Sequence, residues 1–208
     1  MSTPRGGPSD TRPTYRATIG SQVVDLPIVP LDDEVAVALL ITVDLGISFC
    51  EHAGRELAAI LEDRGVDVVA SVATMGIPFA IEVSRALGND QYVIFHKTPK
   101  IHLKDAVAEP VRSITTDVPQ RLLLDRARIH AVEHRRVALI DDVISTGSSA
   151  AAAMRLLRSV GATPVALGAI VTEGDAWRAT LGDDAGLVQS LGVLPLFSRR
   201  ADGGYDQR

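Results

Sequence analysis

The sequence predicts an α/β fold, in which an open, twisted, mostly parallel sheet carries helices on both faces. Short apolar runs rich in valine alternate with longer segments of helical periodicity, and glycines separate many of them. Apolar runs of this kind suit strands that are buried on both sides, as in parallel sheets. Strand, helix and strand in repeated succession indicate βαβ units, whose crossovers place helices over the sheet.

The first residues, 1–14, differ in composition from the rest of the chain. They are rich in Ser, Thr, Pro, Gly and Arg and lack the apolar run of a secretory signal, so we expect a flexible arm. Residues 15–208 are then expected to form a single domain, because a chain of this length supports one good-sized core. Two short runs, 15–19 and 22–26, flank Gly20-Ser21, a pair that is typical of a hairpin turn.

The alternating pattern follows this hairpin. Residues 27–33 read as a connection, and residues 35–42 are apolar enough for either a strand or a short helix. Residues 47–64 have helical spacing of apolar side chains, and Gly65 is placed to end that helix. Further strands are predicted at 66–72, 92–95, 137–140 and 165–171, and further helices at 77–87 and 148–160. Less regular elements are expected at 111–115 and 121–129.

Composition and charge exclude several classes of protein. The formal net charge of −5 argues against a general nucleic-acid binder, because such a protein needs a basic face. The single cysteine, Cys50, excludes a disulfide framework and a cysteine-rich zinc site. No apolar stretch is long enough to cross a bilayer. We therefore expect a cytoplasmic protein with no membrane partner.

The most informative stretch runs from Val137 to Ser149. A buried strand leads into two adjacent acids, Asp141 and Asp142, and then into small and hydroxylated residues around Gly147 before a helix begins. Backbone N–H groups at a helix start, aided by the helix dipole, favour an anion such as a monophosphate. Two carboxylates at a strand end can accept hydrogen bonds from the two hydroxyls of a ribose. Taken singly, the acid pair also suits a solvated loop, and the small hydroxylated residues also suit a helix cap. The order of strand, acid pair, loop and helix favours a ligand site.

This segment closely resembles the phosphoribosyl pyrophosphate (PRPP) motif of type I phosphoribosyltransferases. Asp141, Asp142 and residues 145–149 fill the motif without a gap. The resemblance extends from about residue 15 to residue 173 and is closest to the adenine and xanthine enzymes. It implies the fold of that family, with a small hood that the N-terminal segment and C-terminal residues add to the sheet.

The resemblance implies an enzyme, a pentosyltransferase that uses PRPP and a nitrogenous base. The enzyme would transfer ribose 5-phosphate to a purine or purine-like base, release pyrophosphate and form a nucleoside 5′-monophosphate. Mg²⁺ would be its cofactor, held near Asp141 and Asp142 indirectly, through PRPP or water. A homodimer is expected because homodimers are common in this family. The identity of the base is left open.

The resemblance also gives roles to individual residues. Asp141, Asp142 and Lys97 are the expected catalytic residues, and Lys97 is expected to reach the leaving pyrophosphate because it directly follows a strand. Residues expected to bind substrate are Ala73, Thr74, Met75, Gly76, Lys100, Val143, Ile144, Ser145, Thr146, Gly147, Ser148 and Ser149. The polar segment 96–118 would form a lid that is mobile in the free protein and closes over bound substrates.

Other functions stay open at this point. A regulator that binds PRPP without chemistry would keep the same motif, and so would an enzyme of specialised metabolism that ribosylates an unusual heterocycle. A PRPP synthetase would need two such domains and a longer chain. A Rossmann protein would need Gly-x-Gly-x-x-Gly after its first strand, which the sequence lacks.

Overall fold

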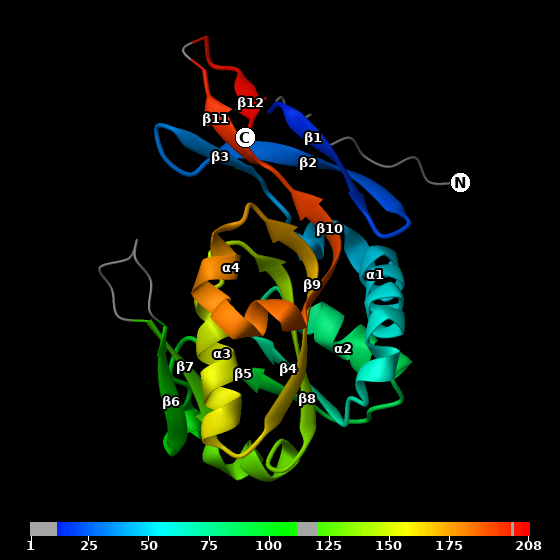
Figure 1. Ribbon diagram of the computed structural model, residues 1–208, viewed down its shortest axis with the longest axis vertical. Helices are drawn as coiled ribbons and strands as arrows, with labels where there is room; N and C mark the ends of the chain where they lie inside the picture. Colours follow the sequence, from blue (N-terminus) through cyan, green and yellow to red (C-terminus); the bar gives the residue numbers. More distant parts are fainter. Residues whose placement is uncertain (1–11, 112–119, 201) are drawn as a thin grey trace.

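Two sheets lie one above the other in the computed structural model, which describes residues 12–111, 120–200 and 202–208 (Figure 1). The lower sheet is parallel and carries the helices, and the upper sheet is antiparallel. Residues 1–11, most of the expected flexible arm, lie outside the described residues. The first strand begins at Thr14, the last residue of that expected arm.

The parallel sheet has five strands in the order β10-β9-β8-β4-β5. Every neighbouring pair runs parallel, which agrees with the prediction of a mostly parallel sheet. β8 lies in the middle of this order, where both of its edges are paired. The strands are β4 (Val68–Val72), β5 (Tyr92–Phe95), β8 (Arg136–Ile144), β9 (Thr163–Glu173) and β10 (Val188–Leu194).

Helices cover both faces of the parallel sheet, as predicted. α1 (Gly46–Leu61) and α2 (Ile77–Ala86) pack on one face, and α3 (Ser148–Ser159) and α4 (Ala176–Leu181) lie on the other (Figure 1). Alternate residues of β8 therefore enter two separate apolar clusters, Ile140 in one and Leu139 in the other. Short 3₁₀ turns complete the helical structure: η1 (Thr42–Asp44), η2 (Glu62–Arg64), η3 (Ile101–Leu103), η4 (Arg126–Ala131) and η5 (Gly182–Leu187).

The antiparallel sheet has the strand order β1-β2-β3-β11-β12 and joins both ends of the described chain. The predicted hairpin is present, but β2 continues to Pro30, so the expected connection at 27–33 is wrong for its first residues. Ile28 is buried there and pairs with β3, which explains the extension. The apolar run at 35–42 forms a strand and then a 3₁₀ turn. The strands are β1 (Thr14–Ile19), β2 (Gln22–Pro30), β3 (Val35–Ala38), β11 (Leu196–Arg199) and β12 (Tyr205–Gln207).

A separate hairpin, β6 (Ala106–Val111) with β7 (Gln120–Asp125), packs beside α3. Arg155 of α3 donates from Nε to Glu109 at 2.6 Å and from Nη2 to the carbonyl of Pro110 at 3.0 Å. This hairpin occupies part of the expected lid, and the mobility of that lid stays a prediction. Residues 112–119, which include most of the less regular element expected at 111–115, lie outside the described residues.

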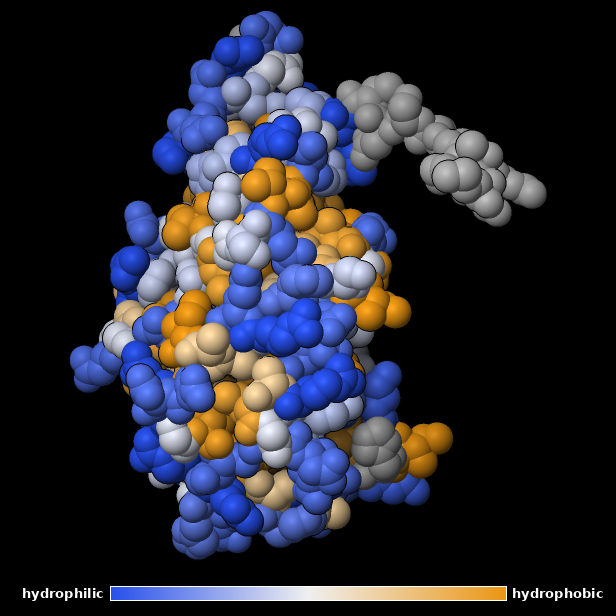
Figure 2. All heavy atoms as spheres, turned by 90° about the vertical axis from the view of Figure 1, so that its right-hand side faces the viewer, coloured by the Kyte–Doolittle hydropathy of each residue, from blue (hydrophilic) through white to orange (hydrophobic). Residues whose placement is uncertain are grey.

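Close backbone contact joins the two sheets. The N–H of Gly20 donates to the carbonyl of Leu191 at 2.9 Å, and the N–H of Ser21 donates to the Glu56 carboxylate of α1 at 3.1 Å. A Cβ on Gly192 would lie 2.7 Å from the carbonyl oxygen of Thr18. Seen from the side of α1, apolar residues gather near this junction and polar residues cover much of the remaining surface (Figure 2). Among the described helices, none combines the length and the hydropathy that crossing a membrane requires.

Gly192→Ala should destabilise the protein, because the new Cβ meets a backbone oxygen that can move only with β1. We expect the free energy of unfolding to fall by about 1–3 kcal/mol, as for other overpacked sites. Gly186→Ala is the matched control, since its Cβ would meet no atom within 4 Å. Urea denaturation of both variants measures the difference. Equal stabilities would mean that the junction tolerates a wider separation of the sheets.

Candidate functional site

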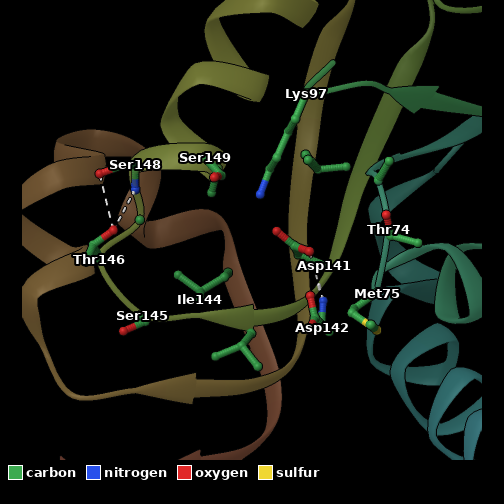
Figure 3. A pocket seen from close by; sticks show the side chains of 15 residues that line it. Thr74, Met75, Lys97, Asp141, Asp142, Ile144, Ser145, Thr146, Ser148 and Ser149 are labelled. Atoms are coloured by element: carbon green, nitrogen blue, oxygen red, sulfur yellow. Dashed lines mark hydrogen bonds between the residues drawn. The ribbon is translucent and has the colours of Figure 1, made fainter. Parts of the chain in front are cut away.

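A cavity of about 340 Å³ opens at the carboxyl ends of β4, β5 and β8. Thirteen of the residues that the sequence singled out line it. These are Ala73, Thr74, Met75, Lys97, Asp141, Asp142, Val143, Ile144, Ser145, Thr146, Gly147, Ser148 and Ser149. In Figure 3, Lys97, the acid pair and the loop at 145–149 surround one common space. This position agrees with the rule that ligands of open α/β sheets bind outside the carboxyl ends of the strands.

The acid pair lies within β8 rather than after it. The sequence predicted that the strand ends at residue 140, but pairing with β9 continues to Ile144. Asp141 accepts a hydrogen bond from the backbone N–H of Asp142 at 3.0 Å. Burial raises the pKa of Asp141 well above its ordinary value of 3.8, and the adjacent carboxyl of Asp142 raises it further. The positive charge of Lys97 acts in the opposite direction and lowers this pKa.

Lys97 has an exposed side chain, and its backbone adjoins a residue that is hydrogen-bonded to a neighbouring strand. It follows β5 directly, and the residue before it, His96, exchanges two backbone hydrogen bonds with Leu123 of β7, at 2.9 and 2.8 Å. The side chain extends toward Asp141 across the cavity (Figure 3). Lys97 thus directly follows β5, and its expected role at the leaving pyrophosphate stays a prediction. Lys100 follows on the exposed segment before η3 and does not line the cavity.

The loop at residues 73–76 closes another side of the cavity. The N–H of Ala73 donates to the carbonyl of Phe95 at 2.9 Å, and the peptide bond between Ala73 and Thr74 is cis. Gly76 does not line the cavity, yet a Cβ there would lie 3.0 Å from Oδ1 of Asp141. Glycine at this position therefore allows the loop to approach the acid pair closely.

A buried threonine, Thr42, holds this loop from beneath. Its hydroxyl donates to the carbonyl of Met75 at 3.2 Å and lies 3.4 Å from the sulfur of the same residue. Thr42 is fully buried in η1, at the end of the connection from β3. The sequence reasoning missed this residue, because a threonine at the end of an apolar run carries no signal of what it contacts.

The loop at 145–149 leads from β8 into α3. Gly147 has a φ of 78° in the left-handed region, and a Cβ there would lie 3.1 Å from the Cα of Trp177. α3 begins at Ser148, whose N–H lies 3.4 Å from the hydroxyl oxygen of Thr146. The first N–H groups of a helix lack partners within the helix and favour an anion. The loop thus combines a helix start with several hydroxyl groups beside one cavity.

The last residue of β9, Glu173, contacts this loop from the protein side. Its carboxylate accepts a hydrogen bond from the Ser145 hydroxyl at 2.7 Å, and the residue is 7% exposed. The sequence analysis gave Glu173 no role. The partner of its side chain lies 28 residues away along the chain, so no local pattern reveals the contact.

Comparison with known proteins identifies the family. The sequence pattern of the phosphoribosyl transferase domain matches residues 49–189, well over half of the chain. The chain belongs to this family. Its match spans β4 to β9 and therefore contains the whole of the cavity described above.

Individual members of the phosphoribosyl transferase domain family resemble the chain over part of their length. It is 34% identical to a xanthine phosphoribosyltransferase of Agathobacter rectalis, over 58% of this chain and 62% of that protein. It is 26% identical to an adenine phosphoribosyltransferase of Methanococcus vannielii, over 58% of this chain and 66% of that protein. The chain thus matches less than two thirds of the length of these two relatives.

A solved structure shows the same fold. The adenine phosphoribosyltransferase of Giardia lamblia, complexed with 9-deazaadenine, superimposes with a TM-score of 0.58 at 20% identity. The match covers 69% of this chain and 78% of that one. The prediction of a type I phosphoribosyltransferase fold with a central parallel sheet is therefore confirmed.

The acid pair supplies some of the ligands that a Mg²⁺ ion requires. Mg²⁺ prefers oxygen ligands and is often held by one or two carboxylates together with substrate phosphates and water. Asp141 and Asp142 supply carboxylate oxygens beside the cavity. Across the described residues, no group of three or more His, Cys, Asp or Glu side chains is placed to hold a metal. The pair therefore fits an ion whose other ligands come from the substrate and from water.

Thr42→Val should loosen the loop at 73–76, because valine keeps the shape of threonine but cannot donate to the carbonyl of Met75. We expect the free energy of unfolding to fall by about 1 kcal/mol. The sequence predicts that this loop binds pyrophosphate, and on that prediction the variant should bind pyrophosphate more weakly. Thr172→Val, at another buried threonine, is the control. Calorimetric titration with pyrophosphate measures the affinity of each variant. Unchanged affinity in Thr42→Val would show that the loop keeps its shape without this bond.

Asp141→Asn should flatten the dependence of stability on pH. The pKa of Asp141 is raised in the folded protein, so the folded state binds more protons than the unfolded state above about pH 3.8. Stability is therefore lost as pH rises from that value through the raised pKa. Asparagine keeps the acceptor oxygen for the N–H of Asp142 but cannot ionise. Urea denaturation from about pH 4 to about pH 8 tests this, and parallel curves for wild type and variant would contradict it.

Proposed function

We propose that this chain is a phosphoribosyltransferase that uses PRPP to ribosylate a purine or a purine-like base. The products would be a nucleoside 5′-monophosphate and pyrophosphate. One observation carries the proposal: a single cavity joins a helix-start loop, an acid pair and a second loop with a lysine. PRPP has three matching parts, a monophosphate, a ribose with two free hydroxyls and a pyrophosphate.

Each part of PRPP has a counterpart in the cavity. The N–H groups of residues 145–149 and the hydroxyls of Thr146, Ser148 and Ser149 would bind the 5-phosphate, whereas the Ser145 hydroxyl donates to Glu173. The carboxylates of Asp141 and Asp142 would accept hydrogen bonds from the ribose hydroxyls. The backbone at 73–76 and the ammonium group of Lys97 would bind the pyrophosphate. Lys100, which lies outside the cavity, stays a prediction as a substrate-binding residue.

The reaction exchanges one bond at the anomeric carbon for another. The bond from this carbon to the pyrophosphate oxygen breaks, and its electron pair leaves with pyrophosphate. A base nitrogen forms the new bond on the opposite face, and its proton is released to solvent. Positive charge develops on the ribose ring meanwhile, and the nearby carboxylates of Asp141 and Asp142 stabilise it. Lys97 offsets the negative charge that grows on the pyrophosphate.

Mg²⁺ belongs to this proposal as a cofactor. When bound, it would supply positive charge that neutralises the pyrophosphate. Asp141 and Asp142 are the residues that would hold it, through PRPP or through water. A cation bound nearby would favour the ionised carboxylate of Asp141, whose pKa is raised in the free protein.

Other parts of the proposal rest on the family resemblance. The antiparallel sheet above the cavity would serve as the hood over the base, and residues 96–118 would serve as the lid. A homodimer and a cytoplasmic location are further expectations.

The rival functions differ in what they predict, since a regulator would bind PRPP without turnover. An enzyme of specialised metabolism would turn over an unusual heterocycle in preference to adenine or xanthine.

Turnover of PRPP with a panel of bases tests the proposal. With Mg²⁺ present, we expect pyrophosphate release and nucleotide formation with at least one purine or purine analogue. Lys97→Ala should lower kcat on the order of 10²-fold, since it removes charge where negative charge grows, and should leave the KM for the base unchanged.

Lys104→Ala is the matched control for Lys97, because Lys104 is an exposed lysine on the same segment but away from the cavity. PRPP binding without turnover of any base in the panel would favour the regulator. Equal kcat values for Lys97→Ala and Lys104→Ala would remove Lys97 from the reaction.

A further inference from the structure

A buried carboxyl group lies beneath the loop at 145–149. Glu173 is 7% exposed, and burial raises the pKa of its carboxyl group. No salt bridge reaches it within the described residues. Burying such a group without a counter-ion is unfavourable unless its hydrogen bonds compensate. The Glu173 carboxylate accepts a hydrogen bond from the Ser145 hydroxyl at 2.7 Å.

The segment that follows Glu173 makes a second contact with the same loop. The backbone of Trp177 lies beneath Gly147, where a Cβ would come within 3.1 Å. The indole N–H of Trp177 donates to the carbonyl of Gly174 at 3.0 Å, which fixes the segment itself. The first and third residues of the loop therefore both rest on the stretch from Glu173 to Trp177.

The bond to Glu173 determines what Ser145 offers to a ligand. Its hydroxyl proton is directed to the carboxylate, so this hydroxyl does not donate to a ligand in the cavity. Fixing the first residue of the loop also limits the directions in which the following N–H groups point. Donors that are oriented before binding stabilise an anion more effectively than donors that must reorganise.

We propose that Glu173 is a positioning residue for the 5-phosphate loop, which it holds through the hydroxyl of Ser145. This inference rests on the proposed function of that loop. A protonated carboxyl group still has an acceptor oxygen, so the bond to Ser145 persists when the acid is neutral. A neutral acid also avoids repulsion with a phosphate bound on the other side of the loop.

Glutamine resembles the protonated form of glutamate in shape and charge, and its carbonyl oxygen can accept the same hydrogen bond from Ser145. Glu173→Gln should therefore keep the loop in place, whereas Glu173→Leu should not. Ser145→Ala removes the donor of the same bond. Since all three changes affect a single contact, the effects of Ser145→Ala and Glu173→Leu should not add.

Calorimetric titration with ribose 5-phosphate and with PRPP measures binding without turnover. We expect Glu173→Leu and Ser145→Ala each to weaken binding by about tenfold, the effect of one lost hydrogen bond. The double variant should be no weaker than the weaker single variant. Glu173→Gln should stay within about threefold of wild type. The KM for the base should not change in any of them.

Thr172→Val is the matched control, since Thr172 is the buried neighbour on the opposite face of β9. Thermal unfolding shows whether each variant is folded. If Glu173→Leu does not fold, the comparison of Glu173→Gln with Ser145→Ala still tests the inference. Additive losses, equal weakness of the Gln and Leu variants, or a changed KM for the base would overturn the inference. Failure of the wild-type chain to bind ribose 5-phosphate would instead contradict the proposed function.

Discussion

The shared carboxyl edge of parallel strands is the constraint on which the site depends. β4 leads into the loop at 73–76, β5 into Lys97 and β8 into the loop at 145–149. Because these strands are parallel and hydrogen-bonded to one another, their ends meet at one edge. Segments that are far apart in sequence thus surround one cavity. The same edge contributes Glu173 from β9, which pairs with β8 on its other side.

Asp141 is buried in a position that disfavours its ionised form in the free protein. Burial and the adjacent carboxyl of Asp142 both raise the pKa of Asp141, whereas the charge of Lys97 lowers it by less. Groups that are kept in such positions are common at functional sites, where a ligand offsets the cost. Ribose hydroxyls and a nearby cation would both favour the ionised pair. A ligand that donates hydrogen bonds to these carboxylates would therefore offset part of the cost of burying them.

The sequence was sufficient for features that depend on neighbouring residues. The valine-rich runs predicted strands of the parallel sheet, and the stretch from Val137 to Ser149 predicted the strand, acid pair and loop. Features that depend on distant partners were missed. The strands β10, β11 and β12 were not predicted, because their moderate hydrophobicity becomes a strand signal only when β10 pairs with β9, β11 with β3 and β12 with β11. Thr42 and Glu173 were missed for the same reason.

Those two missed residues lie at the connections between the sheets. Thr42 ends the segment that leaves β3 of the antiparallel sheet and enters α1. Glu173 pairs with Leu194 at the end of β10, from which the chain passes into β11. Each residue holds one of the two loops that face the cavity. The position of the antiparallel sheet and the geometry of both loops are therefore linked through short, well-packed segments.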